Sequence, residues 1–190
     1  GDPGGGGGAR GRPGRTAAML LGMRAAVLGV VACLGLLGCA PTLDFTLPDL
    51  DGNEVRPHTE DSVVVLAFWA TWCRPCRTEL AEMNEMYQRL HPRGLGLYAI
   101  SVDGPETRDD VESWVQSNHY AFPVLVDDGA RLFGRYNPMG TIPYLVIYDA
   151  SGERIDTRRG YTPCAVAQLE KFLDQRLPSP RSPHVPRCRD

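Results

Sequence analysis

The chain has little net charge for its length, and no run of lysines and arginines stands out in it. Its formal charge at pH 7 is −3 over 190 residues, and Lys171 is its only lysine. Proteins that bind nucleic acid usually gather basic charge to meet the phosphates. We therefore expect no nucleic acid among the partners of this protein.

An internal repeat is missing as well, and the length limits the number of domains. Hydrophobic residues make up 43% of the chain and aromatic residues 8%. This composition suits one well-buried domain, and 190 residues are too few for two ordinary ones. We expect the folded unit to run from about Leu43 to Leu177.

Neither end of the chain has enough large apolar residues to form a hydrophobic core. The start, GDPGGGGGARGRPGR, has no large apolar residue and is rich in glycine. We interpret 1–22 as a disordered leader or as a product of too early a translation start. The end, PSPRSPHVPRCRD, has four prolines, and 178–190 is predicted to be an irregular tail.

The apolar run near the N-terminus is short for a membrane span. Ala25–Gly38 has fourteen residues and follows Arg24. A positive start before a short apolar run is typical of a signal peptide, which we predict over 23–38. The rest of the chain is therefore expected to be exported.

The end of this segment, LLGC, resembles the lipobox of bacterial lipoproteins. In that family the cysteine, here Cys39, is lipidated and becomes the first residue of the mature protein. The resemblance implies a membrane-anchored lipoprotein on the periplasmic side. An ordinary signal peptide or a short anchor helix, with Cys39 incidental, is the alternative.

Strand-like and helix-like patterns alternate between the two ends. Continuous apolar, β-branched runs predict buried strands, and apolar residues three and four apart predict helices. The predicted strands are 62–70, 95–102, 122–126, 144–148 and 153–157, after a hairpin over 45–55. The predicted helices are 74–90, 106–118, 130–136 and a last one capped by Thr162 and ending near Arg176. This order predicts an α/β layered domain with a mixed sheet.

The pair Cys73 and Cys76 lacks the companions that a metal or haem site would need. A second closely spaced ligand pair, usual for zinc, is missing, and Arg77 stands where haem attachment requires histidine. A copper-delivery protein of the Sco type would have a wider cysteine spacing. A purely structural disulfide this local would restrain little unfolded-state entropy.

The surroundings of the pair favour a redox couple instead. Cys73 falls at a predicted strand-to-helix junction, where free N–H groups and the helix dipole stabilise a thiolate. Pro75 lies in the first helical turn, where its missing N–H costs little. Cys76 follows one turn later and can resolve a mixed disulfide. We predict a redox-active disulfide as the reaction centre, with no metal and no other cofactor.

Four segments follow one another along the folded part of the chain: DFTLPDLDG, VVVLAFWATWCRPCRTE, ISVDG and TIPYLVIYDASGERI. Together they resemble the exported TlpA/ResA-like thiol-disulfide oxidoreductases of the thioredoxin-fold superfamily. The resemblance implies a thioredoxin-like α/β fold, with a mixed central sheet flanked by helices and an N-terminal hairpin. It also implies a strand-helix insert, which we place around 122–136.

The resemblance assigns roles to the central residues. Cys73 matches the exposed attacking cysteine, and Cys76 matches the buried resolving cysteine. Pro143 matches a cis-proline that faces the disulfide, where the backbone of Ile142 can pair with a substrate peptide. A trans proline at the start of a strand is the alternative.

The residues around Cys73 are expected to meet the substrate. Trp69 and Trp72 are placed beside the active site, although plain core packing is the alternative for Trp69. Arg74 and Pro75, which lie between the cysteines, complete the expected substrate-binding set. The cationic Arg74 should favour the Cys73 thiolate and thereby raise the reduction potential.

Departures from the family pattern raise the question of the proton acceptor. Thioredoxin has a buried aspartate where this chain has Ala67, and Ala81 replaces a proline that often kinks the helix. Glu79 lies one turn after Cys76 on the same helix face and matches an acid of ResA-like proteins. The alternatives are an exposed glutamate, like Glu82, with water as the acceptor.

The resemblance implies an exported protein-disulfide reductase. Its expected partners are exported disulfide-bearing proteins, including cytochrome c apoproteins, and a membrane thiol electron donor. A peroxiredoxin would need threonine three residues before its cysteine, where Ala70 stands instead. A module that only docks peptides would not need both cysteines.

Cys164 and Cys188 are the last cysteines of the expected exported part. In an exported protein they are able to pair and close the tail onto the last helix. Two unpaired thiols are the alternative.

Overall fold

The computed structural model describes residues 43–57 and 63–179, besides Gly1 and Gly4. The predicted leader and signal peptide, Cys39, and Cys188 in the tail lie outside this part, so the predictions about them stay predictions. None of the described helices has the length and apolar character needed to cross a membrane.

A five-stranded mixed sheet, in the order β5-β4-β3-β6-β7, forms the centre of the fold. The parallel strands are β3 (Val63–Trp69), β4 (Leu95–Ser101) and β5 (Val124–Val126). β6 (Tyr144–Asp149) runs antiparallel to β3, and β7 (Arg154–Arg159) runs antiparallel to β6. Every residue of β3 and β4 is buried, as their continuous apolar runs predict.

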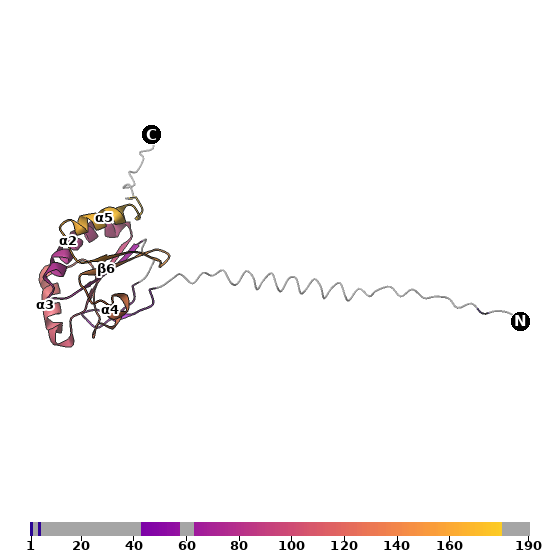
Figure 1. Ribbon diagram of the computed structural model, residues 1–190, viewed down its shortest axis with the longest axis horizontal. Helices are drawn as coiled ribbons and strands as arrows, with labels where there is room; N and C mark the ends of the chain where they lie inside the picture. Colours follow the sequence, from indigo (N-terminus) through magenta and orange to yellow (C-terminus); the bar gives the residue numbers. More distant parts are fainter. Residues whose placement is uncertain (2–3, 5–42, 58–62, 180–190) are drawn as a thin grey trace, which may run out of the picture. The chain divides into compact units, whose positions relative to one another are not determined.

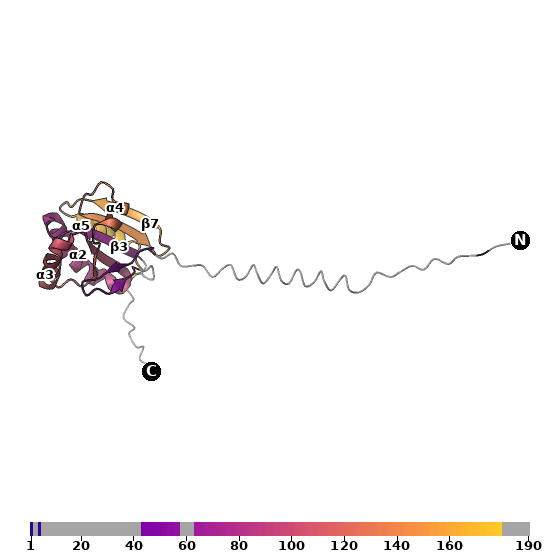
Figure 2. The same ribbon diagram turned by 90° about the horizontal axis from the view of Figure 1, so that it is seen from below.

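Helices cover both faces of this sheet (Figure 1). α2 (Arg74–Leu90), α3 (Arg108–Asn118) and α5 (Ala165–Asp174) pack in the core on one face. α4 (Arg131–Tyr136) packs in the core on the other face, and Figure 2 shows it over the strands when the molecule is seen from below. Side chains of β3 alternate between the two cores, so a single strand supports both layers.

Short elements complete the chain. β1 (Leu47–Pro48) and β2 (Glu54–Val55) form the predicted N-terminal hairpin. Two single-turn 3₁₀ helices, His91–Arg93 and Pro105–Thr107, follow α2 and precede α3. The predicted strand-helix insert is confirmed by β5 and α4, which fall within 122–136.

The start of the last helix differs from the prediction. Thr162 does not cap α5, because the N-cap position is held by Cys164, which makes no side-chain cap hydrogen bond. The Thr162 carbonyl instead accepts a turn hydrogen bond from the Ala165 N–H at 2.9 Å. Cys164 then has φ 73°, a left-handed conformation that cannot belong to a right-handed helix. The helix therefore begins at Ala165. Cys164 is exposed and unpaired within the described residues, and its predicted partner Cys188 lies outside them.

Candidate active site

The two cysteines form a disulfide at the start of α2, after a short loop, 70–72, that follows the end of β3. Their Sγ atoms are 2.04 Å apart, and their Cα atoms are 5.3 Å apart. Cys73 is the N-cap of α2, and its Sγ accepts a hydrogen bond from the Cys76 N–H at 3.2 Å. Pro75 lies in the first turn. After reduction, the same N–H group and the positive end of the helix dipole favour an anionic Cys73 sulfur.

The expected exposure of Cys73 is wrong for this oxidised state. Cys73 exposes only 6% of its surface, and Cys76 exposes none. The disulfide holds the Cys73 sulfur against the buried Cys76 sulfur, and both residues belong to the core beneath α2. Cys73 still holds the only exposed surface of the pair, so a reagent from outside meets Cys73 first.

A cis peptide bond joins Ile142 to Pro143, as the resemblance implies. Pro143 directly precedes β6, whose first residue pairs with Phe68 near the end of β3. This register brings Pro143 to the end of the sheet from which β3 leads into the cysteine motif. The Pro143 carbonyl also accepts a hydrogen bond from the Gly160 N–H at 2.8 Å. The turn after β7 therefore joins the same end of the sheet.

The two tryptophans before the motif have opposite environments. Trp69 is 1% exposed and packs in the core with both cysteines, which is the core-packing alternative. Its Nε1–H is buried without a hydrogen-bond acceptor among the described residues. Trp72 is 67% exposed and stands on the surface directly before Cys73. Arg74 and Pro75 are exposed as well, so the surface beside the disulfide comes from Trp72, Arg74 and Pro75.

Glu79 is buried, which rules out the alternative of an exposed helix glutamate. It is 4% exposed, whereas Glu82 on the next turn is exposed. No described residue forms a hydrogen bond with its carboxyl group. Burial, and to a lesser degree the negative charge of Glu82, raise the pKa of Glu79 to about 7, although the positive charge of Arg158 opposes both effects. Glu79 is thus poised to gain or lose a proton near neutral pH, one helical turn from Cys76.

A second buried carboxylate, Asp103, was not singled out by the sequence analysis. It is 1% exposed and follows the end of β4. It accepts hydrogen bonds from the Thr71 N–H at 2.9 Å and the Thr71 hydroxyl at 2.5 Å. The hydroxyls of Ser101 and Thr107 donate to it at 2.8 and 3.2 Å. Because Thr71 lies two residues before Cys73, Asp103 anchors the loop that leads to the disulfide. The available signal was the acid of the ISVDG segment after a buried strand.

Metal-binding residues do not cluster in the part of the chain that the structure describes. No group of three or more histidine, cysteine, aspartate or glutamate side chains is placed there to hold an ion.

Comparison with known proteins agrees with this geometry. Residues 39–153 match the AhpC/TSA family. The chain is 31% identical over 136 residues to the thiol-disulfide oxidoreductase ResA of Bacillus cereus, and the match covers 71% of this chain and 76% of the relative. It is 25% identical over 158 residues to the sporulation thiol-disulfide oxidoreductase A of Bacillus subtilis, covering 83% of this chain and 93% of that protein.

Solved structures show the same fold. A putative thiol:disulfide interchange protein DsbE from Chlorobium tepidum superposes with a TM-score of 0.59 at 26% identity, covering 70% of this chain and 93% of that one. A putative protein disulfide isomerase from Bacteroides thetaiotaomicron gives a TM-score of 0.63 at 27% identity, covering 73% and 87%. Both likenesses confirm the predicted thioredoxin-like architecture. The chain therefore belongs to the AhpC/TSA family, as a ResA-like thiol-disulfide oxidoreductase.

Proposed function

We propose that this oxidoreductase is exported and reduces disulfides in other exported proteins. The observation that carries the proposal is the unequal cysteine pair beside a cis-proline, with the little exposed surface on Cys73 alone. The signal-like segment 23–38 supports export. Apocytochromes c are one fitting substrate class, because haem attachment to their paired cysteines requires free thiols.

The reaction transfers two electrons from the reduced pair to the substrate. The Cys73 thiolate attacks one sulfur of the substrate disulfide, forms a mixed disulfide and releases the other substrate sulfur as a thiolate. The Cys76 thiolate then attacks the Cys73 sulfur, which restores the Cys73–Cys76 disulfide and frees the second substrate thiol. A membrane thiol electron donor returns two electrons to the pair and completes the cycle.

Glu79 accepts the proton that the Cys76 thiol must lose before its attack. A buried thiol has a raised pKa, so a nearby base accelerates this step. Glu79 suits the role because it lies one helical turn from Cys76 and its pKa of about 7 leaves a large ionised fraction at neutral pH.

The substrate chain lies over the exposed surface beside the disulfide. The backbone of Ile142, next to the cis-proline, pairs with the substrate backbone, and Trp72, Arg74 and Pro75 contact its side chains. Lipidation at Cys39 would hold the domain at the membrane, close to its electron donor, and Cys39→Ser should then release it into the soluble fraction.

Insulin reduction tests the assignment. Purified protein should reduce insulin disulfides with dithiothreitol as the donor. Cys73→Ser should abolish the reaction, because the attacking sulfur is lost, whereas Cys76→Ser should accumulate mixed disulfides that gel electrophoresis without reductant detects. Full insulin reduction by Cys73→Ser would refute the proposed mechanism.

A further inference from the structure

The loop that leads to the cis-proline begins with a buried asparagine. Asn137 directly follows α4 and is 2% exposed. Its backbone N–H donates to the Phe133 carbonyl at 2.7 Å, which ties its backbone to the last turn of α4. A polar side chain is costly to bury unless it forms a hydrogen bond. Asn137 has no part in the reaction steps described above, so its hydrogen bond indicates where it acts.

The Asn137 side chain forms this hydrogen bond with the segment before the cis-proline. Its Nδ2–H donates to the Thr141 carbonyl at 2.7 Å. Between these two residues the chain turns outward, and Met139 is 82% exposed. The Gly140 N–H donates to the Asn137 carbonyl at 2.9 Å, and the Gly140 φ of 68° is left-handed, where glycine is favoured. Asn137 therefore holds both ends of this loop.

Ile142 lies between two residues whose carbonyl groups are held. Thr141 before it is held by the Asn137 side chain. Pro143 after it accepts a hydrogen bond from the Gly160 N–H at 2.8 Å, and the Ile142 side chain packs against the cores on both faces of the sheet. The Ile142 backbone N–H and carbonyl, in contrast, form no hydrogen bond with any residue that the structure describes. A free backbone N–H and carbonyl at the end of a sheet can pair with an extended chain.

The Asn137 contact determines the direction of the Ile142 N–H. The Thr141 carbonyl and the Ile142 N–H belong to one planar trans peptide group, so they point in opposite directions. Because the carbonyl points at the buried Asn137 amide, the N–H points away from it. Rotation of this peptide group would turn the N–H and break the hydrogen bond to Asn137. Asn137 thus restricts the Ile142 N–H to one orientation.

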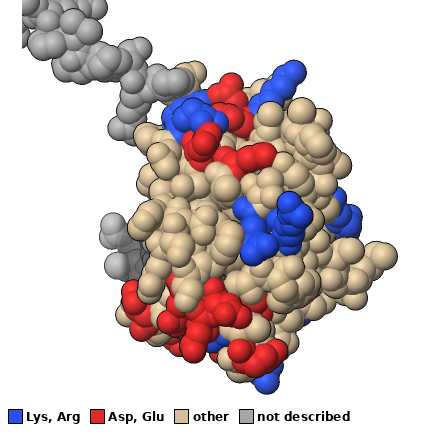
Figure 3. Space-filling view, turned by 90° about the vertical axis from the view of Figure 1, so that its left-hand side faces the viewer, with Lys and Arg blue, Asp and Glu red and all other residues tan. Residues whose placement is uncertain are grey.

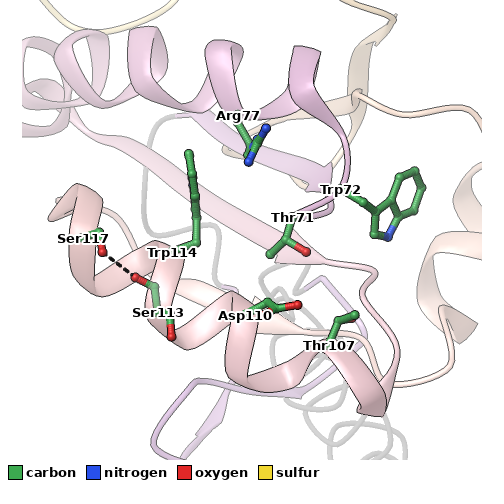
Figure 4. Close-up of a pocket in the computed structure, with 8 residues that line it drawn as sticks. All are labelled: Thr71, Trp72, Arg77, Thr107, Asp110, Ser113, Trp114 and Ser117. Atoms are coloured by element: carbon green, nitrogen blue, oxygen red, sulfur yellow. Dashed lines mark hydrogen bonds between the residues drawn. The ribbon is translucent and has the colours of Figure 1, made fainter.

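Charge does not favour one class of substrate beside the disulfide. Arg77 and Asp110 both line the groove next to Trp72, so the groove holds one charge of each sign (Figure 4). The face that Figure 3 shows also carries basic and acidic side chains in separate groups. Pairing with the substrate backbone needs no particular side chain, so it is the contact that any extended substrate can make.

We propose that Asn137 is a positioning residue, which directs the Ile142 N–H at a backbone carbonyl of the chain that Cys73 attacks. The inference rests on the proposed function. Asn137 does not contact the substrate itself but acts through the Thr141 carbonyl. Its loss should therefore weaken the binding of an extended substrate more than it slows the sulfur chemistry.

Two peptide disulfides of one sequence test this role. The second carries N-methyl groups on the backbone nitrogens beside its reactive cysteine, which prevent its chain from pairing as a strand. With dithiothreitol as the donor, the full-length wild type should show a KM about tenfold lower for the unmethylated peptide. Asn137→Ala should raise this KM about fivefold with little change in kcat, and should hardly affect the KM of the methylated peptide.

Two further variants separate the hydrogen bond from other effects. Asn137→Asp keeps the size of the side chain but replaces the donating amide by an oxygen, so it should raise the KM of the unmethylated peptide as well. Thr141 is exposed, so water can satisfy its carbonyl in both variants and they should stay folded. Asn118→Ala removes a matched bond in α3, where the Asn118 amide donates to the Trp114 carbonyl at 2.7 Å, and should leave both KM values unchanged.

The comparison of the two peptides distinguishes positioning from structural support. A role of Asn137 in folding alone would impair the reduction of both peptides equally, and this result would overturn the proposal. An unchanged KM in both Asn137 variants would overturn it too, as would equal KM values of the two peptides in the wild type. If the wild type reduced neither peptide, the proposed function itself would fail.

Discussion

Asp103 and Glu79 are both buried carboxylates close to the disulfide, but their surroundings differ. Asp103 accepts hydrogen bonds from Thr71, Ser101 and Thr107. Glu79 has no hydrogen-bond donor among the described residues, and burial raises its pKa to about 7. A buried carboxylate with several donors can tie segments together, whereas one without donors is costly to ionise. The presence or absence of hydrogen-bond donors therefore distinguishes the anchoring carboxylate, Asp103, from the proposed proton acceptor, Glu79.

The position of each carboxylate matches its role. Asp103 stands outside α2 and joins the loop before Cys73 to the end of β4. Glu79 stands inside α2, where the charges of Glu82 and Arg158 act on its pKa. Arg158 also pairs with Asp156 at 3.1 Å, so its charge is shared and only partly offsets the burial of Glu79. The anchor of the loop before Cys73 and the proposed proton acceptor of Cys76 are therefore two different carboxylates.

The largest expected effect comes from removing the anchor. Asp103→Ala should lower the free energy of unfolding by about 3–5 kcal/mol, because it leaves the donors of Thr71 and Ser101 without their acceptor. Urea unfolding of the oxidised protein measures this change. Asp109→Ala, an exposed acid of the same region, should change stability by less than about 0.5 kcal/mol. A mild effect of Asp103→Ala would remove the distinction between the two carboxylates.

A smaller effect should appear in the pH dependence of stability. Folding raises the pKa of Glu79 from 4.5 to about 7, so the folded state binds its proton more tightly than the unfolded state. The contribution of Glu79 to the free energy of unfolding is therefore greatest below about pH 4.5. It falls as the pH rises towards 7, by about 3 kcal/mol in total.

Glu79→Gln isolates this contribution. The variant should lack the decrease between pH 5 and 8 that urea unfolding shows for the wild type. Glu85→Gln, an exposed residue of the same helix, should retain the decrease. Identical pH profiles for wild type and Glu79→Gln would mean that folding does not raise the pKa of Glu79, and would contradict the effect of its burial.

Much of the fold could be predicted from the sequence because its signals are local. The periodicity of α2 predicted its bounds, Arg74–Leu90, and the continuous apolar run predicted the buried strand β3. The predicted start of α5 was wrong. Thr162-Pro163 is a typical local pattern for the start of a helix, but the left-handed conformation of Cys164 delays the start to Ala165. A backbone turn of this kind leaves no periodicity to detect.

Features of the site that depend on the spacing of residues along the chain could be predicted, whereas features that depend on tertiary contacts could not. The cysteine spacing and the one-turn offset of Glu79 are visible in the sequence. The burial of Glu79 depends on the packing of α2 against the rest of the domain, and the role of Asp103 depends on a contact with Thr71, 32 residues away. The low exposure of Cys73 likewise follows from its bond to a sulfur in the core.

The smallest expected effects concern the pH–rate profile of the Cys76 attack, measured by single turnover of a mixed disulfide. If Glu79 accepts the proton, the wild-type rate should rise with pH about a midpoint near the Glu79 pKa of about 7. Glu79→Gln should slow the attack most near neutral pH, by about tenfold or more. It should also shift the midpoint of the profile to higher pH, towards the pKa of the buried Cys76 thiol. An unchanged profile would leave water as the acceptor.

Glu82→Gln should move the same profile in the opposite direction. Glu82 raises the pKa of Glu79 by charge repulsion, but burial is the larger cause, so the midpoint should fall by less than burial has raised it. The Tyr161 hydroxyl donates a hydrogen bond to the Glu82 carboxylate at 2.6 Å, and Tyr161→Phe would remove this bond while keeping the Glu82 charge. Tyr161→Phe should therefore not lower the midpoint of the pH–rate profile. A downward shift in Tyr161→Phe as large as in Glu82→Gln would show that the link between α2 and the turn after β7, rather than the charge of Glu82, sets the proton affinity of Glu79.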